Sequence, residues 1–423
     1  MPNDNWRKVD IKDVCESVID CINKTAPSIQ EVTPYKMIRT TNVKNGWVDL
    51  SQVRYVKKEI YEKWTRRSKP IKGDVILTRE APLGEVGMLR VDDTIFLGQR
   101  LVMYRANPKK LDKHFLLYSL MSHEVQGQIK SFGSGSTVEH MRVPDCERIQ
   151  LGIPSLKIQK KIGRVLSAYD DLIENNTRRI KILEEMAQLI YQEWFVKFKF
   201  PGHEKVKMVD SPLGKIPEGW EDIPIVNIPS FRFINEKIKP YKNEKNYFAT
   251  ADINGLDIVN EGLPYKYNER PSRAQKQPIV NSVWFARMKD TYKILCFTEI
   301  NKEFAENTIL SSGFCGFEIE SDWLSYFYFT VKSTEFHEKK DIYTTGATQM
   351  SLTDEGLKKL SWIIPDSKIV VLYNEICYTV INQILKLQEK NNNLRKTRDL
   401  LLPKLISGEI DVEDLDINIG ESA

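Results

Sequence analysis

The chain has 423 residues, a net charge of +4 and 41% hydrophobic residues, a size that fits more than one globular domain. It contains no apolar run of about 18 residues and no signal-peptide pattern, so we expect a cytoplasmic protein without a membrane span. Its six cysteines are scattered without metal-ligand spacing, which argues against a zinc or disulfide scaffold and predicts reduced thiols in or near cores.

The first third of the chain predicts short strands and turns followed by a helix. Residues 35–49 and 71–105 contain β-forming runs, such as 75–77 and 101–104, with Pro82, Gly84 and Gly87 between them. Residues 113–129 then show the apolar spacing of a helix. This order of elements predicts a small α+β globule.

A basic cluster with interleaved aromatic residues lies within this globule. From Arg54 to Lys72 there are eight basic and two acidic residues, with Tyr55, Tyr61 and Trp64 among them. Such a cluster suits a nucleic-acid backbone, although a solvated loop or helix face explains a single cluster equally well. The acidic stretch after residue 408 masks this bias, because residues 1–408 alone carry a net charge of +10.

A long heptad segment follows Pro154. Apolar residues recur at alternating three- and four-residue steps from Ile158 to Trp194, which as a helix would be about 55 Å long. A lone helix of this length with one apolar stripe would be unstable in water, so it needs a partner. Residues 198–212 follow neither the helix nor the strand period and are predicted to be a linker.

The chain repeats itself at an offset of 211 residues. Gly135-Ser136-Thr137 precedes Pro154 at the same distance as Gly346-Ala347-Thr348 precedes Pro365, and both prolines open a heptad segment. Upstream, the strand ending in Arg79 matches the strand ending in Arg287. A second basic cluster, beside Tyr265 and Tyr267, consists of Lys266, Arg270, Arg273 and Lys276. A duplicated unit that ends in a long helix suggests a protein that recognises two similar targets at a fixed separation.

The second long helix, from Ile369 to about Leu402, is the expected partner of the first, and Pro403 should end or kink it. Polar residues interrupt the two apolar stripes at Asn176, Gln383 and Arg398. If buried, they would fix the register of the pair; the alternative is that they face solvent at the ends of an imperfect coil. The residues expected to form the coil are Ile158, Ile162, Val165, Tyr169, Leu172, Leu183, Ile190, Ile369, Tyr373, Ile376, Val380, Leu394 and Leu401.

Signals for catalysis are weak. The sequence lacks a phosphate-binding Gly-rich loop and a Rossmann fingerprint, and its five histidines are far apart. Asp354 followed by Asp366-Ser367-Lys368 faintly resembles a metal-dependent nuclease pattern. However, the repeat partner of Asp366 is Ser155, and these two residue types replace each other as helix caps but not as metal ligands. We therefore predict no metal site and no catalytic residue.

The repeated residues also carry a family resemblance. The run Leu213-Gly-Lys-Ile-Pro-Glu-Gly-Trp-Glu221, the Gly135-Ser136-Thr137 triplet with Ile153-Pro154 downstream, and the run from Asn393 to Glu409 resemble the specificity subunit of type I restriction-modification systems. The resemblance covers nearly the whole chain. One departure lies near the N-terminus, where Trp6 lacks the Ile-Pro-x-Gly that precedes Trp220.

The resemblance implies an α+β fold with two pseudo-symmetric target-recognition domains separated by a long antiparallel two-helix coiled coil. It places the recognition domains at 1–154 and 213–365, the conserved helices at 155–197 and 366–406, and an acidic tail at 407–423. It also implies double-stranded DNA as ligand, read as two half-sites, and methyltransferase and restriction/translocase subunits as partners. The subunit itself would perform no chemistry and bind no cofactor; S-adenosylmethionine, ATP and Mg would belong to the partners.

Candidate DNA-contacting residues fall into three groups. Loop residues near the repeated Gly-x-Thr element are the first choice, although both glycines could serve only a turn. Arg79 and Arg287 are candidate base readers, with Glu80 as an acceptor from cytosine, unless they pair with acids within their domains. Arginines of the basic clusters are candidates for phosphate contacts. The full set is Arg66, Arg67, Arg79, Lys130, Ser134, Ser136, Thr137, Arg142, Arg270, Arg273, Arg287, Thr345, Thr348 and Gln349.

A non-catalytic coiled-coil scaffold that binds protein partners rather than DNA is the rival interpretation. Binding that does not respond to salt would favour it, because phosphate contacts make DNA binding fall steeply with salt concentration.

Overall fold

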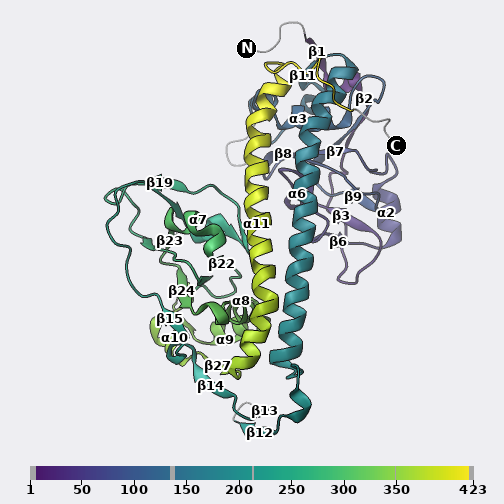
Figure 1. Ribbon diagram of the computed structural model, residues 1–423. Coiled ribbons are helices and arrows are strands. Elements are labelled where there is room, and N and C mark those ends of the chain that lie inside the picture. Colours follow the sequence, from purple (N-terminus) through teal and green to yellow (C-terminus); the bar gives the residue numbers. More distant parts are fainter. Residues whose placement is uncertain (1–5, 134–138, 212–213, 348, 419–423) are drawn as a thin grey trace. The chain divides into compact units, whose positions relative to one another are not determined.

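The computed structural model describes residues 6–133, 139–211, 214–347 and 349–418, and the chain divides into two compact units. Unit 1 comprises residues 1–173 and 393–423, and unit 2 comprises residues 174–392 (Figure 1). Helix α6 (Leu156–Tyr191) begins in unit 1 and ends in unit 2, and helix α11 (Ser367–Ile406) begins in unit 2 and ends in unit 1. Each unit therefore mixes sheets, short helices and a part of both long helices.

Unit 1 is built on a six-stranded sheet. Its strand order is β2 (Cys15–Asp20), β10 (Leu101–Ala106), β7 (Val75–Arg79), β8 (Leu83–Met88), β5 (Gly46–Val48) and β4 (Val43–Lys44). A second sheet contains β6 (Arg54–Tyr55), β3 (Lys36–Ile38) and β9 (Ile95–Leu97), and β1 (Arg7–Asp10) pairs with β11 (Gln150–Ile153). The short helices are α1 (Ile11–Val14), α2 (Lys58–Trp64), α3 (Lys113–Met121), α4 (His123–Phe132) and α5 (Val143–Glu147).

Unit 2 has two four-stranded sheets. The first has the order β15 (Phe231–Phe233), β24 (Phe314–Ile319), β21 (Ser282–Ala286) and β22 (Ile294–Phe297); the second has the order β19 (Leu263–Tyr265), β16 (Lys245–Phe248), β23 (Thr308–Ser311) and β20 (Ala274–Lys276). Short pairs are β14 (Glu221–Pro224) with β27 (Ser361–Ile364), β17 (Ile253–Asn254) with β18 (Asp257–Ile258), and β25 (Thr344–Thr345) with β26 (Ser351–Leu352). The short helices are α7 (Lys302–Glu306), α8 (Leu324–Lys332), α9 (Thr334–Ile342) and α10 (Asp354–Lys359).

The repeat found in the sequence is also a repeat of structure. Helices α3, α4 and α5 begin 211 residues before α8, α9 and α10, and α6 begins 211 residues before α11. The antiparallel order β2-β10-β7-β8 recurs as β15-β24-β21-β22. Even a helix cap recurs, because the hydroxyls of Ser122 and Ser333 accept the backbone N–H groups of Val125 and Phe336 at 3.4 and 3.1 Å.

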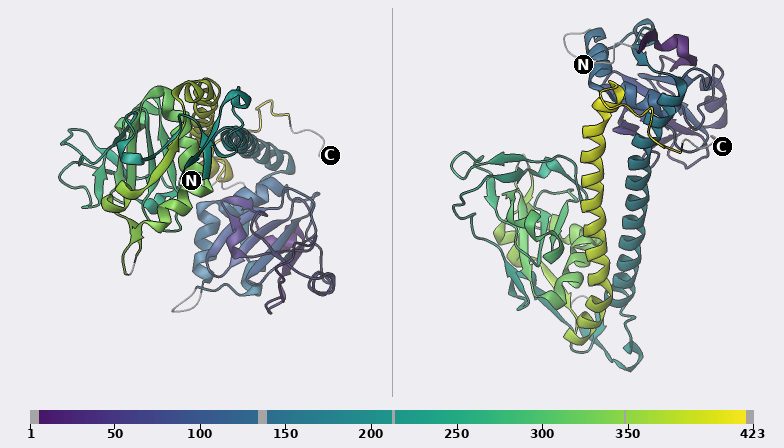
Figure 2. Two further views of the ribbon diagram at one scale, coloured as in Figure 1. Left: turned by 90° about the horizontal axis from the view of Figure 1, so that it is seen from below. Right: turned by 45° about the horizontal axis from the view of Figure 1, so that its top comes forward.

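Each unit has its own apolar core around the central sheet. In unit 1, Val75 and Leu77 of β7 pack with Phe115 and Leu116 of α3, while Ile76 points into a second cluster on the other face of the sheet. A strand buried on both faces lacks polar alternation, as the run 75–77 does. In unit 2, α8 lies between the sheet and α11 (labelled in Figure 1; further views in Figure 2). Ser325 Oγ of α8 donates to Asn374 Oδ1 of α11 at 2.6 Å. All six cysteines are free and five are buried, as predicted.

Within each unit the two long helices run antiparallel. In unit 2, Asn176 Nδ2 donates to Asn391 Oδ1 at 2.9 Å, and Tyr373 Oη donates to the Ala187 carbonyl at 3.1 Å, so residue numbers fall along α11 as they rise along α6. Ile180, Ile384 and Leu387 form an apolar cluster between these contacts. In unit 1, Arg398 Nη1 lies 2.6 Å from Asp170 Oδ1.

The buried stripes differ from the predicted ones. Positions seven apart are buried on both helices; these are Leu166, Ile173, Ile180 and Ala187 on α6, and Val370, Cys377, Ile384, Asn391, Arg398 and Leu405 on α11. The prediction was wrong for Leu172 and Ile376, which are 53% and 46% exposed. The error arose because α6 also carries exposed apolar residues, so that spacing alone does not identify the buried stripe.

Two of the three polar interruptions are part of the helix contacts. Asn176 is half-buried against Asn391, and Arg398 is buried against Asp170, whereas Gln383 is exposed. Both Asn391 and Asp170 escaped the sequence analysis. A buried polar pair costs desolvation unless its partner lies opposite, so these contacts favour one register of α11 on α6.

Other local predictions need correction. The predicted linker 198–212 contains a strand, β12 (Met208–Ser211), which pairs with β13 (Gly214–Pro217); four-residue strands are too short to show a clear period. Pro403 does not end α11, which continues to Ile406. Within the described ranges, we find no helix with the length and apolarity that a bilayer crossing requires.

The acidic stretch after α11 is held against α6 in unit 1. Lys161, which is buried, donates through Nζ to the carbonyl oxygens of Val412, Glu413 and Leu415 at 3.1, 2.6 and 2.7 Å. Val412 is buried in the core of the unit. Lys161 thus binds backbone carbonyls rather than carboxylates, and the acidic side chains between residues 409 and 416 are exposed.

Asp170 is expected to contribute more to stability than Arg398. Its carboxylate also accepts from Tyr118 Oη at 2.7 Å and pairs with Arg90 at 3.1 Å, so Asp170→Ala removes an acceptor from three polar groups, of which Arg90 and Arg398 keep Asp171 and Asp399 as partners. We expect a loss of about 3–5 kcal/mol in the free energy of unfolding, and a smaller loss for Arg398→Ala, which leaves Asp170 with two partners. Urea unfolding followed by circular dichroism measures both; equal losses would contradict the ranking.

Candidate nucleic-acid interface

The repeated Gly-x-Thr elements fall between equivalent helices of the two units. One loop joins α4 to α5 in unit 1, and the other joins α9 to α10 in unit 2. The candidates Ser134, Ser136, Thr137 and Thr348 lie outside the described residues. Gly346 has a φ of +133°, and a Cβ there would lie 2.5 Å from the Gln349 carbonyl oxygen, so the backbone of this loop itself requires glycine.

Both loops are fixed at their C-terminal ends by an arginine. The Met141 N–H donates to the Arg79 carbonyl at 3.0 Å, and Arg79 Nη1 donates back to the Met141 carbonyl at 2.9 Å. In unit 2, the Leu352 N–H donates to the Arg287 carbonyl at 2.8 Å, and Arg287 Nη1 donates to the Leu352 carbonyl at 3.0 Å. The two arginines therefore have the same structural role in both units.

This anchoring corrects the prediction that Arg79 and Arg287 read bases. Arg79 is only 7% exposed, and Arg287 pairs with Asp354 at 2.8 Å, which is the alternative that the sequence left open. Their guanidinium groups are used within the units, because a strand end and a loop end meet there and present carbonyl oxygens. Asp354 is thereby an ion-pair partner of an arginine.

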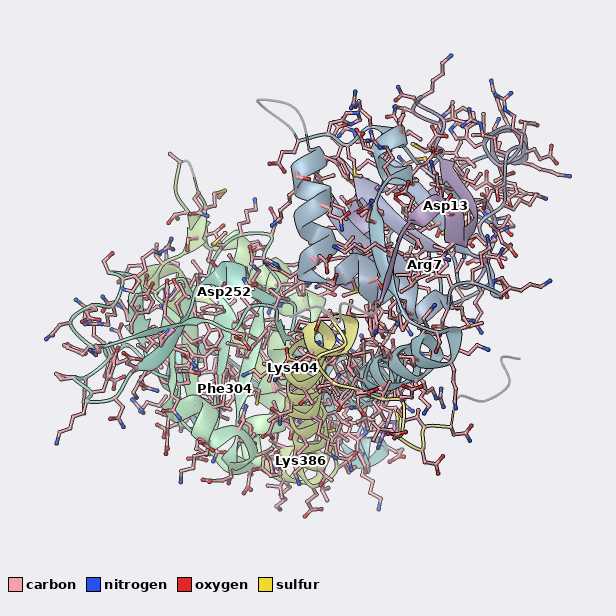
Figure 3. All side chains as sticks on the ribbon, turned by 90° about the horizontal axis from the view of Figure 1, so that it is seen from above. Arg7, Asp13, Asp252, Phe304, Lys386 and Lys404 are labelled. Atoms are coloured by element: carbon pink, nitrogen blue, oxygen red, sulfur yellow. The ribbon has the colours of Figure 1, made fainter. Side chains whose placement is uncertain are left out.

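A turn and a short helical segment adjoin each anchor. The Arg79 N–H donates to the Arg100 carbonyl at 2.8 Å, and the Arg287 N–H donates to the Gly313 carbonyl at 2.9 Å. Asn42 and Asp252, the latter labelled in Figure 3, each accept the backbone N–H of the residue three positions earlier, at 2.9 and 2.7 Å. These repeated contacts build the same frame around each loop.

The side chains on this frame differ between the units. In unit 1, Glu80 lies 3.2 Å from Arg100 Nη2 and 3.4 Å from His140 Nδ1. Residue 80 and residue 140 are bridged, as are their equivalents Met288 and Ser351 in unit 2. The ionisable side chains of Glu80 and His140 in one copy thus correspond to a thioether and a hydroxyl side chain in the other.

The remaining loop candidates are accessible. Lys130 is exposed at the end of α4, and Arg142 is exposed at the start of α5, where it pairs with Asp145 at 2.9 Å. In unit 2, Thr345 and Gln349 are exposed, and Gln349 Nε2 contacts the Met288 sulfur at 3.5 Å. Exposure at the loop ends leaves these side chains free to reach a ligand.

The two basic clusters behave differently. All eight basic residues between 54 and 72 are exposed, including Arg66 and Arg67, and Arg67 pairs with Asp20 at 2.5 Å. In the second cluster only some of the basic side chains are exposed and available to a ligand. Arg270 is half-buried, stacks on Tyr267 at 3.9 Å and donates to the Ala274 carbonyl, so part of its guanidinium group is used within unit 2.

Lys276 also belongs to the fold of unit 2. Its Nζ is buried and donates to the Ile234 and Asn235 carbonyls, both at 3.2 Å. Lys266 and Arg273 remain exposed. The difference from the first cluster arises because residues 274–276 form β20, which draws this stretch into a sheet.

The residues of the faint nuclease pattern cap or brace helices. Asp366 Oδ1 accepts the Lys368 N–H at 2.8 Å at the start of α11, and Ser155 Oγ accepts the Ile158 N–H at 3.4 Å at the start of α6. The equivalence of the two residues as helix caps agrees with the sequence argument.

Removing an anchor should loosen its loop. Arg79→Met leaves the buried Met141 carbonyl without its donor, so we expect a loss of about 1–3 kcal/mol and faster hydrogen exchange at residues 139–141. Lys130→Met in the last turn of α4 is the control, because that side chain is exposed and should change stability by less than about 0.5 kcal/mol. Unchanged exchange in Arg79→Met would show that the loop does not depend on this contact.

The buried His337 should make unit 2 sensitive to acid. Burial, together with the positive charge of the neighbouring Lys340, lowers its pKa from 6.5 to about 4. As the pH falls below 6.5, His337 becomes protonated in the unfolded chain but stays neutral in the folded chain. The contribution of His337 to the free energy of unfolding is therefore fully present above pH 6.5 and is lost as the pH falls towards 4. Between pH 7.5 and 5 we expect a loss of about 2 kcal/mol in urea unfolding.

His337→Phe should remove that loss, because phenylalanine does not titrate. Its ring can keep the contact with Tyr292, whose ring centroid lies 3.5 Å from that of His337. The exposed His123, changed to Phe, is the matched control and should keep the pH dependence. A wild-type slope in His337→Phe would assign the sensitivity to other groups.

Comparisons with known proteins agree with this architecture. Residues 3–185 match the family described as type I restriction modification DNA specificity domain. The chain is 28% identical over 363 residues to the type I restriction enzyme MjaIX specificity subunit of Methanocaldococcus jannaschii, covering 81% of this chain and 79% of the relative. It is 21% identical to the type I restriction enzyme HindI specificity subunit of Haemophilus influenzae, covering 80% and 87%.

The fold is also that of a solved structure. The crystal structure of a type I restriction-modification system S subunit from M. genitalium matches with a TM-score of 0.55 at 16% identity, over 95% of this chain and 97% of that chain. Residues 3–185 therefore match the type I restriction modification DNA specificity domain, and the chain is similar over most of its length to the specificity subunits of type I restriction enzymes.

Proposed function

We propose that this chain reads a bipartite DNA sequence for a type I restriction-modification complex, with one half-site read by each unit. The observation that carries the proposal is the repeated frame around the loops 133–141 and 344–352. The anchoring arginine, the adjacent turn and the capped segment recur in both units, while the side chains on the frame differ. A constant frame with variable side chains suits two readers of different sequences.

Exposed basic residues support contact with the DNA backbone. The eight of the first cluster, together with Lys130 and Arg142, all lie on the surface of unit 1, and Lys266 lies on that of unit 2. Their ammonium and guanidinium groups would neutralise phosphates and fix the position of the protein on the duplex without specifying sequence.

The long helices would hold the partner subunits and set the spacing between half-sites. Ile182, Met186 and Leu189 form an exposed apolar stripe on α6 at helical spacing, in addition to the stripe that packs on α11. Such a stripe suits a methyltransferase subunit, and restriction/translocase subunits would join the same complex. This chain would contribute recognition only, and S-adenosylmethionine, ATP and Mg would serve the partners.

The first test is genome-wide adenine methylation in a host that carries this chain with its methyltransferase partner, compared with the partner alone. A new bipartite motif is expected only when both proteins are present. Deleting residues 231–352 should disturb one half of the motif at most, because each half belongs to one unit. An assembled complex that produces no motif would contradict the proposal.

Salt dependence separates DNA reading from the scaffold alternative. Duplex binding by the complex should weaken by orders of magnitude between 50 and 200 mM salt if several phosphates are contacted. Binding of similar strength at both concentrations would favour a protein scaffold.

A further inference from the structure

We propose that Arg100 in unit 1 and Arg273 in unit 2 are equivalent base readers, each recognising a guanine in its own half-site. This inference rests on the proposed DNA-reading function and assigns two residues and a base to it. The argument depends on where each guanidinium group lies relative to the repeated frame.

Arg100 lies on the turn that adjoins the unit 1 anchor. Its carbonyl accepts the Arg79 N–H, and its φ is +69°, a backbone conformation that residues other than glycine seldom adopt. The side chain is half exposed, and Glu80 lies 3.2 Å from Nη2. The carboxylate therefore aims the guanidinium group while leaving other N–H donors open.

Unit 2 has no side chain at the equivalent position. The residue whose carbonyl accepts the Arg287 N–H is Gly313. A guanidinium group is nevertheless present there, because Arg273 Nη2 would lie 3.6 Å from a Cβ placed on Gly313. Arg273 comes from the segment before β20, and the Ser312 N–H donates to its carbonyl at 2.8 Å, which holds the two segments together.

Each unit thus places a guanidinium group at the equivalent position of the frame. In unit 1 it comes from the turn that adjoins the anchor, and in unit 2 from the segment before β20. Within the part of the chain that the structure describes, Arg273 pairs with no carboxylate, and the equivalent of Glu80 is Met288. An exposed arginine whose N–H groups are not all used within the fold has donors available for a ligand. In the major groove, two parallel N–H donors of arginine match O6 and N7 of guanine.

The test compares duplexes that carry the methylated motif with duplexes in which single G·C pairs are replaced by A·T. The complex with its methyltransferase partner is used throughout. For the wild type, one G·C pair in each half-site should be preferred by roughly tenfold to a hundredfold. Arg100→Ala should reduce that preference to within about twofold in one half-site only, and Arg273→Ala should do so in the other.

Lysine variants test geometry without loss of charge. Arg100→Lys and Arg273→Lys keep a cation but lose the two parallel donors, so discrimination should fall while affinity for non-cognate DNA is kept. Arg232→Ala is the matched control: its side chain is 51% exposed, against 50% for Arg100, and pairs with Glu318 and Glu236 near the other end of the sheet. It should leave both half-sites unchanged.

The outcomes are distinguishable. A wild-type complex without any motif would overturn the proposed function and this inference together. A wild-type motif that survives both alanine variants, or lacks a G·C pair in either half-site, would overturn this inference alone. Uniform weakening with a shallower salt dependence would also overturn it, by making the two arginines phosphate contacts.

Discussion

The architecture of the two units depends on buried polar contacts between α6 and α11. Asn391 and Arg398 occupy positions of α11 that otherwise recur as apolar residues every seven positions, and each is buried. A buried amide or guanidinium group is costly unless its partner faces it, so sliding α11 along α6 would leave these groups unpaired. In unit 2 the partner of Asn391 is Asn176, and in unit 1 the partner of Arg398 is Asp170. Because α6 follows β11 and α11 follows β27 directly, the register of the helices also positions the last strand of each repeated globule.

These contacts break the internal symmetry of the repeat. The offset of 211 residues relates Asn176 and Asn391 to Leu387 and Ile180, which pack together in an apolar cluster of unit 2. The same offset relates Asp170 and Arg398 to Ile381 and Ala187, both in the main core of unit 2. Equivalent layers are thus polar in one copy and apolar in the other. A symmetric pair of stripes would allow alternative registers of similar energy, whereas one polar layer opposite its own partner favours a single arrangement.

The sequence predicted the repeated elements and missed the contacts that depend on residues far away in the chain. The offset, the two long helices and the α+β order of each copy follow from apolar spacing and from glycine and proline positions, and all of these are local signals. The exposed Leu172 and Ile376 could not be recognised, because α6 has apolar residues on two faces and only the partner determines which face is buried. The roles of Arg79 and Arg287 were also hidden, since a matched arginine after a matched strand indicates equally a reader or an anchor. The carbonyl groups that decide between them lie 62 and 65 residues further along the chain.

The arginines that hold the loops and the exposed side chains on the frame are different residues. This separation explains why the two copies can diverge without losing their fold. Arg79 and Arg287 satisfy backbone carbonyl groups, which every residue type presents, so the anchor tolerates any side chain on the loop it holds. The side chains of Arg100 and His140 both lie against that of Glu80, and the equivalents Gly313, Met288 and Ser351 show that the backbone frame persists when all three side chains change. Recognition residues placed on such a frame are free to vary, because their replacement leaves no buried group without a partner. The cost of a new specificity is then confined to the exposed side chains themselves, and the core beneath them does not need to be rebuilt.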